Sequence, residues 1–446
     1  MALSGLDIYK LLPKTNCKKC GSTTCLAFAM KLAMKKASLD QCPDITEEAK
    51  KALDQASRPP IATITIGAGD ENRVEIGGET VLFRHEKTFY HQTAIAISIE
   101  DALSDADIAA RLKSIEAISF ERVGQHIVID AIALIDKSKN TEKFIRALDI
   151  ILTGSKKPLV LVSEAPKTIE AALKKCADRK PLIYAADAGN LKEMAAIAKN
   201  NKAPLALKAK GLEALSGLSN DAISAGMEEL VLDPCPVTLN DALNDLTQIR
   251  RLSLKKNHRA LGYPVISFVT DKDKYHTVQA ASTLIAKYAG LIVLDSIDKE
   301  TLLPIITLRQ NIYTDPQKPV TVEPKLYSFG SVDKNSPVLV TTNFSLTFYT
   351  VSPELEASKI PAYLLVTDSE GMSVLTAWAA EKFTPEVIAE TMKKFDVENT
   401  VSHKKIIIPG YVSVLSGKLE DASGWDVLVG PKEATGIPKY LKEVWK

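Results

Sequence analysis

The chain has 446 residues, 46% of them hydrophobic, and a formal net charge of +1. This length predicts several domains with ordinary apolar cores, and the balanced charge argues against nucleic acid or a membrane surface as a partner. No apolar run reaches the ~18 residues of a spanning helix, and residues 1–5 lack the basic start and long apolar stretch of a secretory signal. We therefore expect a cytoplasmic protein.

The first distinctive feature is a set of cysteines near the N-terminus. Cys17, Cys20, Cys25 and Cys42 follow the spacing C-x2-C-x4-C-x16-C. A zinc ribbon would repeat C-x2-C, whereas three close cysteines and a remote fourth favour a [4Fe–4S] cluster. Structural zinc and unligated thiols remain the alternatives. A helix is expected over Leu26–Lys36, where its positive N-terminal end would favour a negatively charged cluster. Residues 1–57 are predicted to form this small domain.

The middle of the chain, residues 58–314, has the pattern of a barrel. Two strand-like runs, Ile61–Ile66 and Thr80–Arg84, predict a small β cap. Short aliphatic runs then recur, each followed by a helical pattern, which predicts a (β/α)8 TIM barrel, with a doubly wound open sheet as the alternative. The eight predicted strands are Ala94–Ile99, His126–Ala131, Pro158–Ser163, Pro181–Ala186, Pro204–Ala209, Glu229–Pro234, Pro264–Val269 and Gly290–Asp295.

Catalytic chemistry in this barrel is not expected. The polar residues predicted to follow its strands include Asp130, Asp233 and Asp295, and single aspartates in such places are often helix caps. The six histidines are scattered and form no metal-binding pattern. We expect the barrel to act as a scaffold or docking surface.

The last part of the chain predicts a second α/β domain. Residues 315–324 are proline-rich and read as a linker, and residues 325–446 follow as an open, Rossmann-like α/β sheet. Its predicted strands are Val338–Thr342, Ala362–Thr367, Lys405–Ile408 and Trp425–Val429, with helices over Val374–Phe383 and Pro385–Phe395. Ligands of such sheets bind outside the carboxyl ends of the strands. The loops there are rich in glycine, serine and threonine, so they could bind a ligand or could simply be caps and turns.

Together these features resemble, over essentially the whole chain, the large subunit of the corrinoid iron–sulfur protein of the anaerobic acetyl-CoA (Wood–Ljungdahl) pathway. The matching motifs are Cys17–Cys25 with Cys42-Pro43, and the run Thr367–Thr376. The resemblance implies that the four cysteines ligate a [4Fe–4S] cluster and that the C-terminal domain binds a corrinoid (cobamide), with no catalytic residue of its own. The implied corrinoid contacts are Thr342, Leu346, Glu370, Gly371, Met372, Ser373, Ala434 and Gly436.

One absence agrees with the resemblance. The D-x-H-x-x-G motif, whose histidine replaces the lower cobalt ligand in many cobalamin proteins, is missing, and His403 is the only histidine in residues 325–446. The corrinoid is therefore expected to be base-off, without a histidine ligand from the protein.

The resemblance also implies a role and partners. Cob(I)amide would accept a methyl group from methyltetrahydrofolate on a separate methyltransferase and pass it to the nickel site of carbon monoxide dehydrogenase/acetyl-CoA synthase. The cluster would return inactive cob(II)amide to cob(I)amide with electrons from a low-potential donor, and the chain would pair with a small subunit as a heterodimer. The competing hypotheses are a TIM-barrel iron–sulfur reductase and a zinc-stabilised interaction scaffold.

Overall fold

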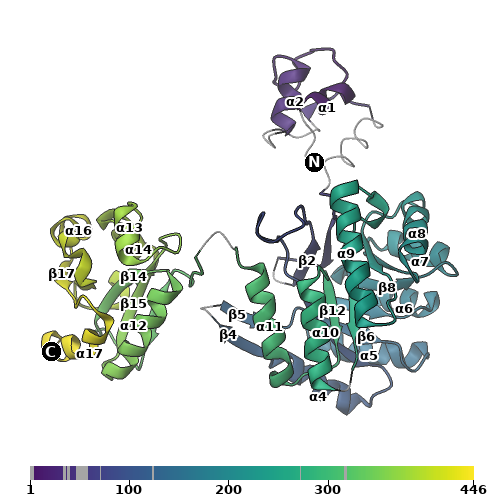
Figure 1. Cartoon of the computed structure of the whole chain (residues 1–446). Helices are drawn as coiled ribbons and strands as arrows, with labels where there is room; N and C mark the ends of the chain where they lie inside the picture. Colours follow the sequence, from purple (N-terminus) through teal and green to yellow (C-terminus); the bar gives the residue numbers. More distant parts are fainter. Residues whose placement is uncertain are drawn as a thin grey trace. The chain divides into compact units, whose positions relative to one another are not determined.

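The computed structural model describes residues 5–33, 37, 41–46, 59–70, 72–122, 125–271, 273–315 and 319–445. The chain divides into two compact units, one of Met1–Ile118 and Val128–Tyr313, the other of Ser119–Ile127 and Thr314–Lys446 (Figure 1). The predicted boundary between the cluster domain and the barrel, at residues 57 and 58, lies outside the described residues. In the described part of the chain, no helix is long and apolar enough to cross a membrane.

The N-terminal segment contains two short helices, α1 (Gly5–Leu11) and α2 (Cys25–Ala33), which pack against each other. The predicted helix over Leu26–Lys36 is thus confirmed as far as Ala33, and residues 34–36 lie outside the described part. Helix α2 starts at Cys25 because the Thr24 hydroxyl accepts a hydrogen bond from the Ala27 N–H at 3.0 Å, which caps the first turn.

The rest of the first unit is built around eight parallel strands in the order β10-β9-β8-β7-β6-β3-β12-β11. A parallel bridge between Leu232 and Val265 nearly closes the sheet into a barrel. The predicted barrel is therefore confirmed over the open doubly wound sheet. The strands are β3 (Ala94–Glu100), β6 (Ala131–Ile135), β7 (Leu159–Val162), β8 (Leu182–Ala186), β9 (Leu205–Lys208), β10 (Leu230–Asp233), β11 (Ile266–Val269) and β12 (Leu291–Leu294).

Helices cover the outside of this barrel because each has one apolar face. In α5, for example, Phe144, Ala147, Leu148 and Ile151 recur at helical spacing and are buried, and Asn140 caps the first turn. The helices are α4 (Asp105–Glu116), α5 (Thr141–Gly154), α6 (Pro166–Cys176), α7 (Leu191–Asn200), α8 (Leu212–Ser224), α9 (Leu239–Lys256), α10 (Lys274–Ala286) and α11 (Lys299–Tyr313), with short 3-10 turns η2 (Ala177–Arg179) and η3 (Arg259–Leu261).

The second barrel strand is β6, and the predicted strand over His126–Ala131 is wrong. Residues Gln125–Val128 (β5) instead pair with β4 (Ser119–Arg122) in a separate two-stranded sheet. The burial explains the difference, because β5 is largely exposed whereas nearly all of β6 is buried. Asp130 consequently precedes β6, at the amino end of the barrel strand, where it accepts hydrogen bonds from the Ile95 N–H and from Arg309.

A β hairpin, β1 (Thr63–Gly67) with β2 (Arg73–Gly77), is present as a cap, but its predicted second strand over Thr80–Arg84 is wrong. That segment is irregular because side chains satisfy its carbonyl groups. Arg250 donates to the Val81 carbonyl at 3.0 and 2.6 Å, and the Tyr288 hydroxyl donates to that of Leu82 at 3.0 Å.

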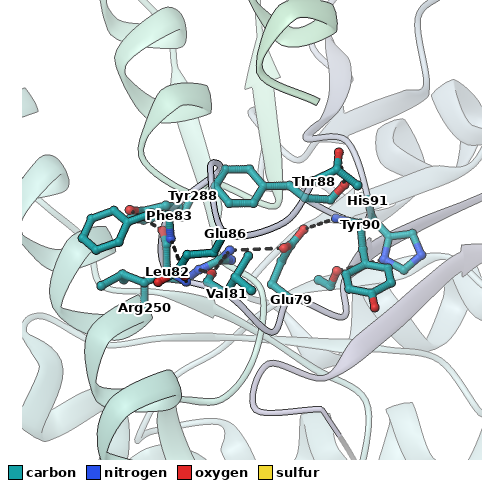
Figure 2. A network of polar contacts seen from close by, with 12 residues as sticks. Glu79, Val81, Leu82, Phe83, Glu86, Thr88, Tyr90, His91, Arg250 and Tyr288 are labelled. Atoms are coloured by element: carbon teal, nitrogen blue, oxygen red, sulfur yellow. Dashed lines mark hydrogen bonds and ion pairs between the residues drawn. The ribbon is translucent and has the colours of Figure 1, made fainter. Parts of the chain in front are cut away.

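The loop that follows β2 is anchored by a buried ion pair, which Figure 2 shows. The Arg250 guanidinium lies 3.1 Å from the Glu79 carboxylate, and their side chains are only 4% and 7% exposed. Glu79 also accepts the Tyr90 N–H at 2.8 Å, and the guanidinium lies over the Phe89 and Tyr288 rings. These contacts hold the loop against α9.

The second unit contains a five-stranded sheet in the order β13-β15-β14-β16-β17. Its first strand, which the sequence analysis missed, is an antiparallel edge, and the remaining strands are parallel. The strands are β13 (Leu326–Phe329), β14 (Val338–Thr342), β15 (Ala362–Thr367), β16 (Lys405–Ile408) and β17 (Asp426–Val429). The helices are α12 (Ser345–Ser358), α13 (Val374–Ala379), α14 (Pro385–Lys394), α15 (Val397–Thr400), α16 (Ser416–Ser423) and α17 (Ile437–Val444), with 3-10 turns η4 (Gly410–Leu415) and η5 (Ala434–Gly436).

Each face of this sheet has its own apolar core. Leu339 of β14 packs with residues of α12 and α17, whereas its neighbour Val340 packs with residues of α13, α14 and α16. Residues 320–322, within the predicted linker, already belong to this unit. The Val322 N–H donates to the Asn343 carbonyl at 2.9 Å, and Val322 is buried.

Candidate metal centre and ligand cavity

The four N-terminal cysteines lie in one neighbourhood. Cys25 and Cys42 are buried in an apolar cluster formed by α1 and α2, and Cys20 packs against that cluster. Burial, together with the charges of the other three thiols, raises the pKa of Cys42. All four are free thiols, so they provide the soft sulfur donors that iron–sulfur clusters and zinc require.

Several contacts position these thiols. The Cys25 N–H donates to the Asn16 side-chain oxygen at 2.8 Å, and the Asn16 N–H lies 3.3 Å from Cys25 Sγ. On the other side, Lys19 forms a 3.1 Å ion pair with Asp44, joining the Cys17–Cys20 loop to the segment after Cys42. Hydrogen bonds from Lys19 and from the Cys17 thiol lower the pKa of Asp44. The loop and the remote cysteine are thus held together by polar contacts as well as by the core.

The thiols lie near one another, but their sulfur atoms do not surround a common point as the ligands of one metal centre would. Over the part of the chain that the structure describes, no three histidine, cysteine, aspartate or glutamate side chains are assembled to hold a metal ion. The donor set nevertheless fits a cluster, and one further observation agrees. The Ser22 hydroxyl, between Cys20 and Cys25, is buried and has no hydrogen-bond partner among the described residues. An ion or ligand bound next to such a group is one way in which it can be satisfied.

The second candidate site is a cavity of about 340 Å³ at the carboxyl ends of the C-terminal strands. The loops after β14 and β16 lead to helices on opposite faces of the sheet, so a crevice opens between these two adjacent strands, the place where open α/β sheets bind ligands. The lining is mainly apolar. It comprises Leu339, Val340, Thr341, Phe344, Leu346, Thr347, Thr350, Val351, Leu364, Ser373, Val374, Ile407, Ile408, Pro409, Tyr411, Gly430, Pro431, Lys432, Glu433, Ala434 and Ile437.

Three of the residues predicted to contact the corrinoid line this cavity: Leu346, Ser373 and Ala434. Thr342 does not. Its neighbour Thr341 does: side chains alternate along a strand, so Thr341 shares the face of Leu339, and Thr342 shares that of Val340.

The remaining predicted contacts lie around the cavity. Glu370 forms a 2.7 Å ion pair with Lys382, and Gly371 has a left-handed backbone against Pro319 and Thr321. Met372 packs against the core beneath α13 and α14, and Gly436 precedes α17.

Apart from Leu346, the sequence analysis did not single out the residues that helix α12 contributes to the cavity wall. Thr347 and Thr350 lie three residues apart on that helix and both face the cavity. These two threonines follow a predicted strand at helical spacing, and that pattern could have indicated a helix face turned toward the ligand site.

Asn343 fixes the loop between β15 and α13. Its side-chain oxygen accepts hydrogen bonds from the N–H groups of Ser369 and Gly371, both at 3.0 Å, and from the Ser369 hydroxyl at 2.8 Å. Its amide donates to Asp368 at 3.0 Å. Glu370 and Gly371 both have positive φ, at 55° and 75°. This buried asparagine therefore holds an unusual loop conformation at the rim of the cavity.

A second cavity, of about 680 Å³, lies at the carboxyl end of the barrel. Its polar groups are largely engaged with one another. The Tyr184 hydroxyl donates to Asp233 at 2.6 Å, and that of Ser98 donates to Asp295. Lys272, in the loop after β11, lies outside the described residues. These hydrogen bonds hold strand ends and loops together.

Comparison with protein families gives two matches. The model described as CO dehydrogenase/acetyl-CoA synthase delta subunit matches residues 63–441, and one described as a putative Fe-S cluster matches residues 12–43, which include all four cysteines. Among solved structures, dihydropteroate synthase from Thermus thermophilus has a TM-score of 0.39 at 15% identity, covering 56% of this chain and 99% of that one.

Curated relatives match the chain from end to end. The corrinoid/iron-sulfur protein large subunit of Moorella thermoacetica is 50% identical over 99% of both chains. The acetyl-CoA decarbonylase/synthase complex subunit gamma of Methanothermobacter thermautotrophicus is 39% identical over 100% of this chain and 99% of its own. This protein therefore belongs to the family that comprises the corrinoid/iron–sulfur protein large subunit and the acetyl-CoA decarbonylase/synthase gamma subunits.

Proposed function

We propose that this chain is a methyl-group carrier, with a [4Fe–4S] cluster on Cys17, Cys20, Cys25 and Cys42 and a corrinoid at the C-terminal cavity. The observation that carries the proposal is the combination of a four-thiol segment with a largely apolar cavity at the crevice of an open α/β sheet. End-to-end likeness to a relative named for both cofactors supports it.

The cavity suits the corrinoid because its interior is apolar and its rim consists of loops. Leu346, Tyr411 and Val414 around the carboxyl edge are large and exposed, which is unfavourable in water unless something covers them. The rim loops Glu370–Ser373 and Gly430–Gly436 offer backbone groups to the polar edge of a macrocycle. Asn343 would keep the first of these loops in place.

The surroundings of His403 support a corrinoid without a histidine ligand from the protein. This histidine precedes β16, at the edge of the sheet opposite the cavity, and its Nε2 lies 2.9 Å from the Ser336 carbonyl oxygen. Its ring packs edge-on against Trp425 and Trp445. A residue engaged in this way does not serve as a lower cobalt ligand.

When bound, the corrinoid supplies cob(I)amide, a strong nucleophile toward methyl groups, and the cluster supplies the electron that restores it from cob(II)amide. Methyltetrahydrofolate would be the methyl source on a separate methyltransferase, and the nickel site of carbon monoxide dehydrogenase/acetyl-CoA synthase the acceptor. The residues that line the cavity would bind and orient the macrocycle, and His403 would not be among them. A small corrinoid subunit and a low-potential electron donor complete the expected set of partners.

The first experiment is an anaerobic absorption spectrum with iron, sulfide, cobalt and zinc quantified on the same sample. The proposal expects about four irons per chain, as a [4Fe–4S] cluster requires, together with one cobalt and base-off corrinoid bands. Iron without cobalt, in protein from a corrinoid-replete cell, would favour an iron–sulfur reductase acting at the barrel cavity. Zinc without iron or sulfide would favour the interaction scaffold.

A further inference from the structure

The loop between Cys20 and Cys25 contains three hydroxyl side chains with different surroundings. Thr24 caps helix α2, and Thr23 is exposed to solvent. Ser22 is only 4% exposed, and its hydroxyl has no hydrogen-bond partner among the described residues. Burying an unpaired hydroxyl is unfavourable, so this group differs from its neighbours in needing a partner that the protein itself does not provide.

A tight backbone turn precedes Ser22. The Gly21 N–H donates to the Lys18 carbonyl at 3.0 Å, which closes a tight turn, and both Lys18 and Gly21 have positive φ, at 61° and 74°. Helix α2 then begins at Cys25. Ser22 is thus a buried residue that lies in the sequence between two of the proposed cluster ligands, Cys20 and Cys25.

The same segment already directs a donor toward a sulfur atom. The Asn16 N–H lies 3.3 Å from Cys25 Sγ. Hydrogen bonds to the sulfurs are among the factors that set the reduction potential of an iron–sulfur cluster. Reduction adds negative charge to the cluster, and hydrogen bonds to charged acceptors are the stronger ones, so each donor stabilises the reduced form.

We propose that the Ser22 hydroxyl donates a hydrogen bond to a sulfur atom of the cluster and thereby raises its reduction potential. This inference rests on the proposed function, because it requires the four cysteines to hold an iron–sulfur cluster. It adds a tuning residue to the ligand set: Ser22 would adjust how readily the cluster accepts an electron for the reactivation of the corrinoid.

The test compares the wild-type protein with the Ser22→Ala and Thr23→Ala variants, all prepared anaerobically. The two substitutions remove neighbouring hydroxyls, one buried and unpaired, the other exposed. Iron and sulfide content, the midpoint potential from a titration followed by electron paramagnetic resonance, and the resonance Raman Fe–S bands in H2O and D2O would be measured. We expect unchanged iron in all three, a more negative midpoint in Ser22→Ala only, and a smaller D2O shift of its Fe–S bands.

Equal midpoints and equal D2O shifts in the wild-type and Ser22→Ala proteins, at equal iron content, would overturn the inference. If the alanine variant holds no iron, the pair Ser22→Thr and Ser22→Val decides, because these side chains have the same shape and differ by the hydroxyl. A more negative potential in the valine variant supports the hydrogen bond, and identical potentials refute it. Zinc in place of iron in the wild-type protein would overturn the proposed function itself, and with it this inference.

Discussion

The side-chain oxygen of Asn343 accepts hydrogen bonds from both the backbone N–H and the hydroxyl of Ser369, at 3.0 and 2.8 Å. Both residues are buried, so these groups have no water to replace the partner if it is lost. The contact joins the loops that follow two adjacent strands, β14 and β15, at the rim of the C-terminal cavity.

We therefore expect Asn343→Ala to loosen the Glu370–Gly371 loop. Leaving buried donors unpaired costs about 1–3 kcal/mol of folding free energy. Urea unfolding of the apoprotein should show this loss, and spectroscopic titration should show weaker corrinoid binding with unchanged iron content. Asn343→Asp keeps accepting oxygens but sets a buried carboxylate against that of Asp368, where the amide now donates, so it should not restore the loss. An alanine variant with wild-type stability would show that the Asn343 contacts contribute little to the free energy of unfolding.

Filling the cavity should separate corrinoid binding from cluster binding. Ala434 lines the cavity, and Ala434→Phe would place an aromatic ring in it. We expect at least tenfold weaker corrinoid binding, which corresponds to about 1.4 kcal/mol, with iron and sulfide unchanged. Ala357→Phe is the matched control, because Ala357 is an exposed residue of α12 that does not line the cavity. Equal corrinoid affinities in the two variants would place the corrinoid elsewhere.

The Glu79–Arg250 pair predicts a pH-dependent loss of stability. Removing one partner of a buried ion pair costs about 3–5 kcal/mol, so Arg250→Met should destabilise the protein strongly at neutral pH. The double variant Glu79→Gln with Arg250→Met should recover part of this loss, because no buried charge is left unpaired.

The pH dependence follows from the direction of the Glu79 pKa shift. Burial raises the pKa of Glu79, although Arg250 opposes this. A carboxyl group whose folded-state pKa is raised contributes stability below its unfolded pKa and loses it as the pH rises through the folded pKa. Loss of Arg250 raises that pKa further, so the deficit of Arg250→Met should be smaller at pH 5 than at pH 8. Urea unfolding at pH 5 and at pH 8 measures the free energy of unfolding that Arg250→Met loses. An equal loss at the two pH values would argue that the unpaired Glu79 carboxylate is not its cause.

Cys20→Ala should remove the cluster while leaving the corrinoid in place. We expect loss of iron and sulfide, no reactivation of cob(II)amide by a low-potential donor, and normal methylation after chemical reduction. Cys176→Ala is the control, because this cysteine is buried in α6, where burial raises its pKa to about 12. Normal reactivation in the Cys20 variant would show that the cluster does not supply the electron.

The errors of the sequence analysis have specific physical causes. A run such as Thr80–Arg84 looks like a strand, but Arg250, some 170 positions away in the sequence, donates to its Val81 carbonyl, and Tyr288 donates to that of Leu82. His126–Ala131 is a mixed run in which β5 ends at Val128 and β6 begins at Ala131, so local pattern could not decide its sheet. The edge strand β13 was missed because its residues are only half-buried and lack a clear alternation.

By itself, the sequence determined the features that depend on neighbouring residues. The parallel strands were predictable because continuous aliphatic runs are stable only when covered on both faces. The cysteine spacing limited the metal chemistry, and strands such as Val338–Thr342 and Ala362–Thr367 were predicted to the residue. Only the tertiary structure decided which residues meet across long separations: Asn343 with the loop after β15, Thr341 rather than Thr342 at the cavity, and Ser22 inside the cysteine loop. Strand alternation, burial and hydrogen-bond partners are properties of the folded chain, because each depends on what packs against a residue from elsewhere in the sequence.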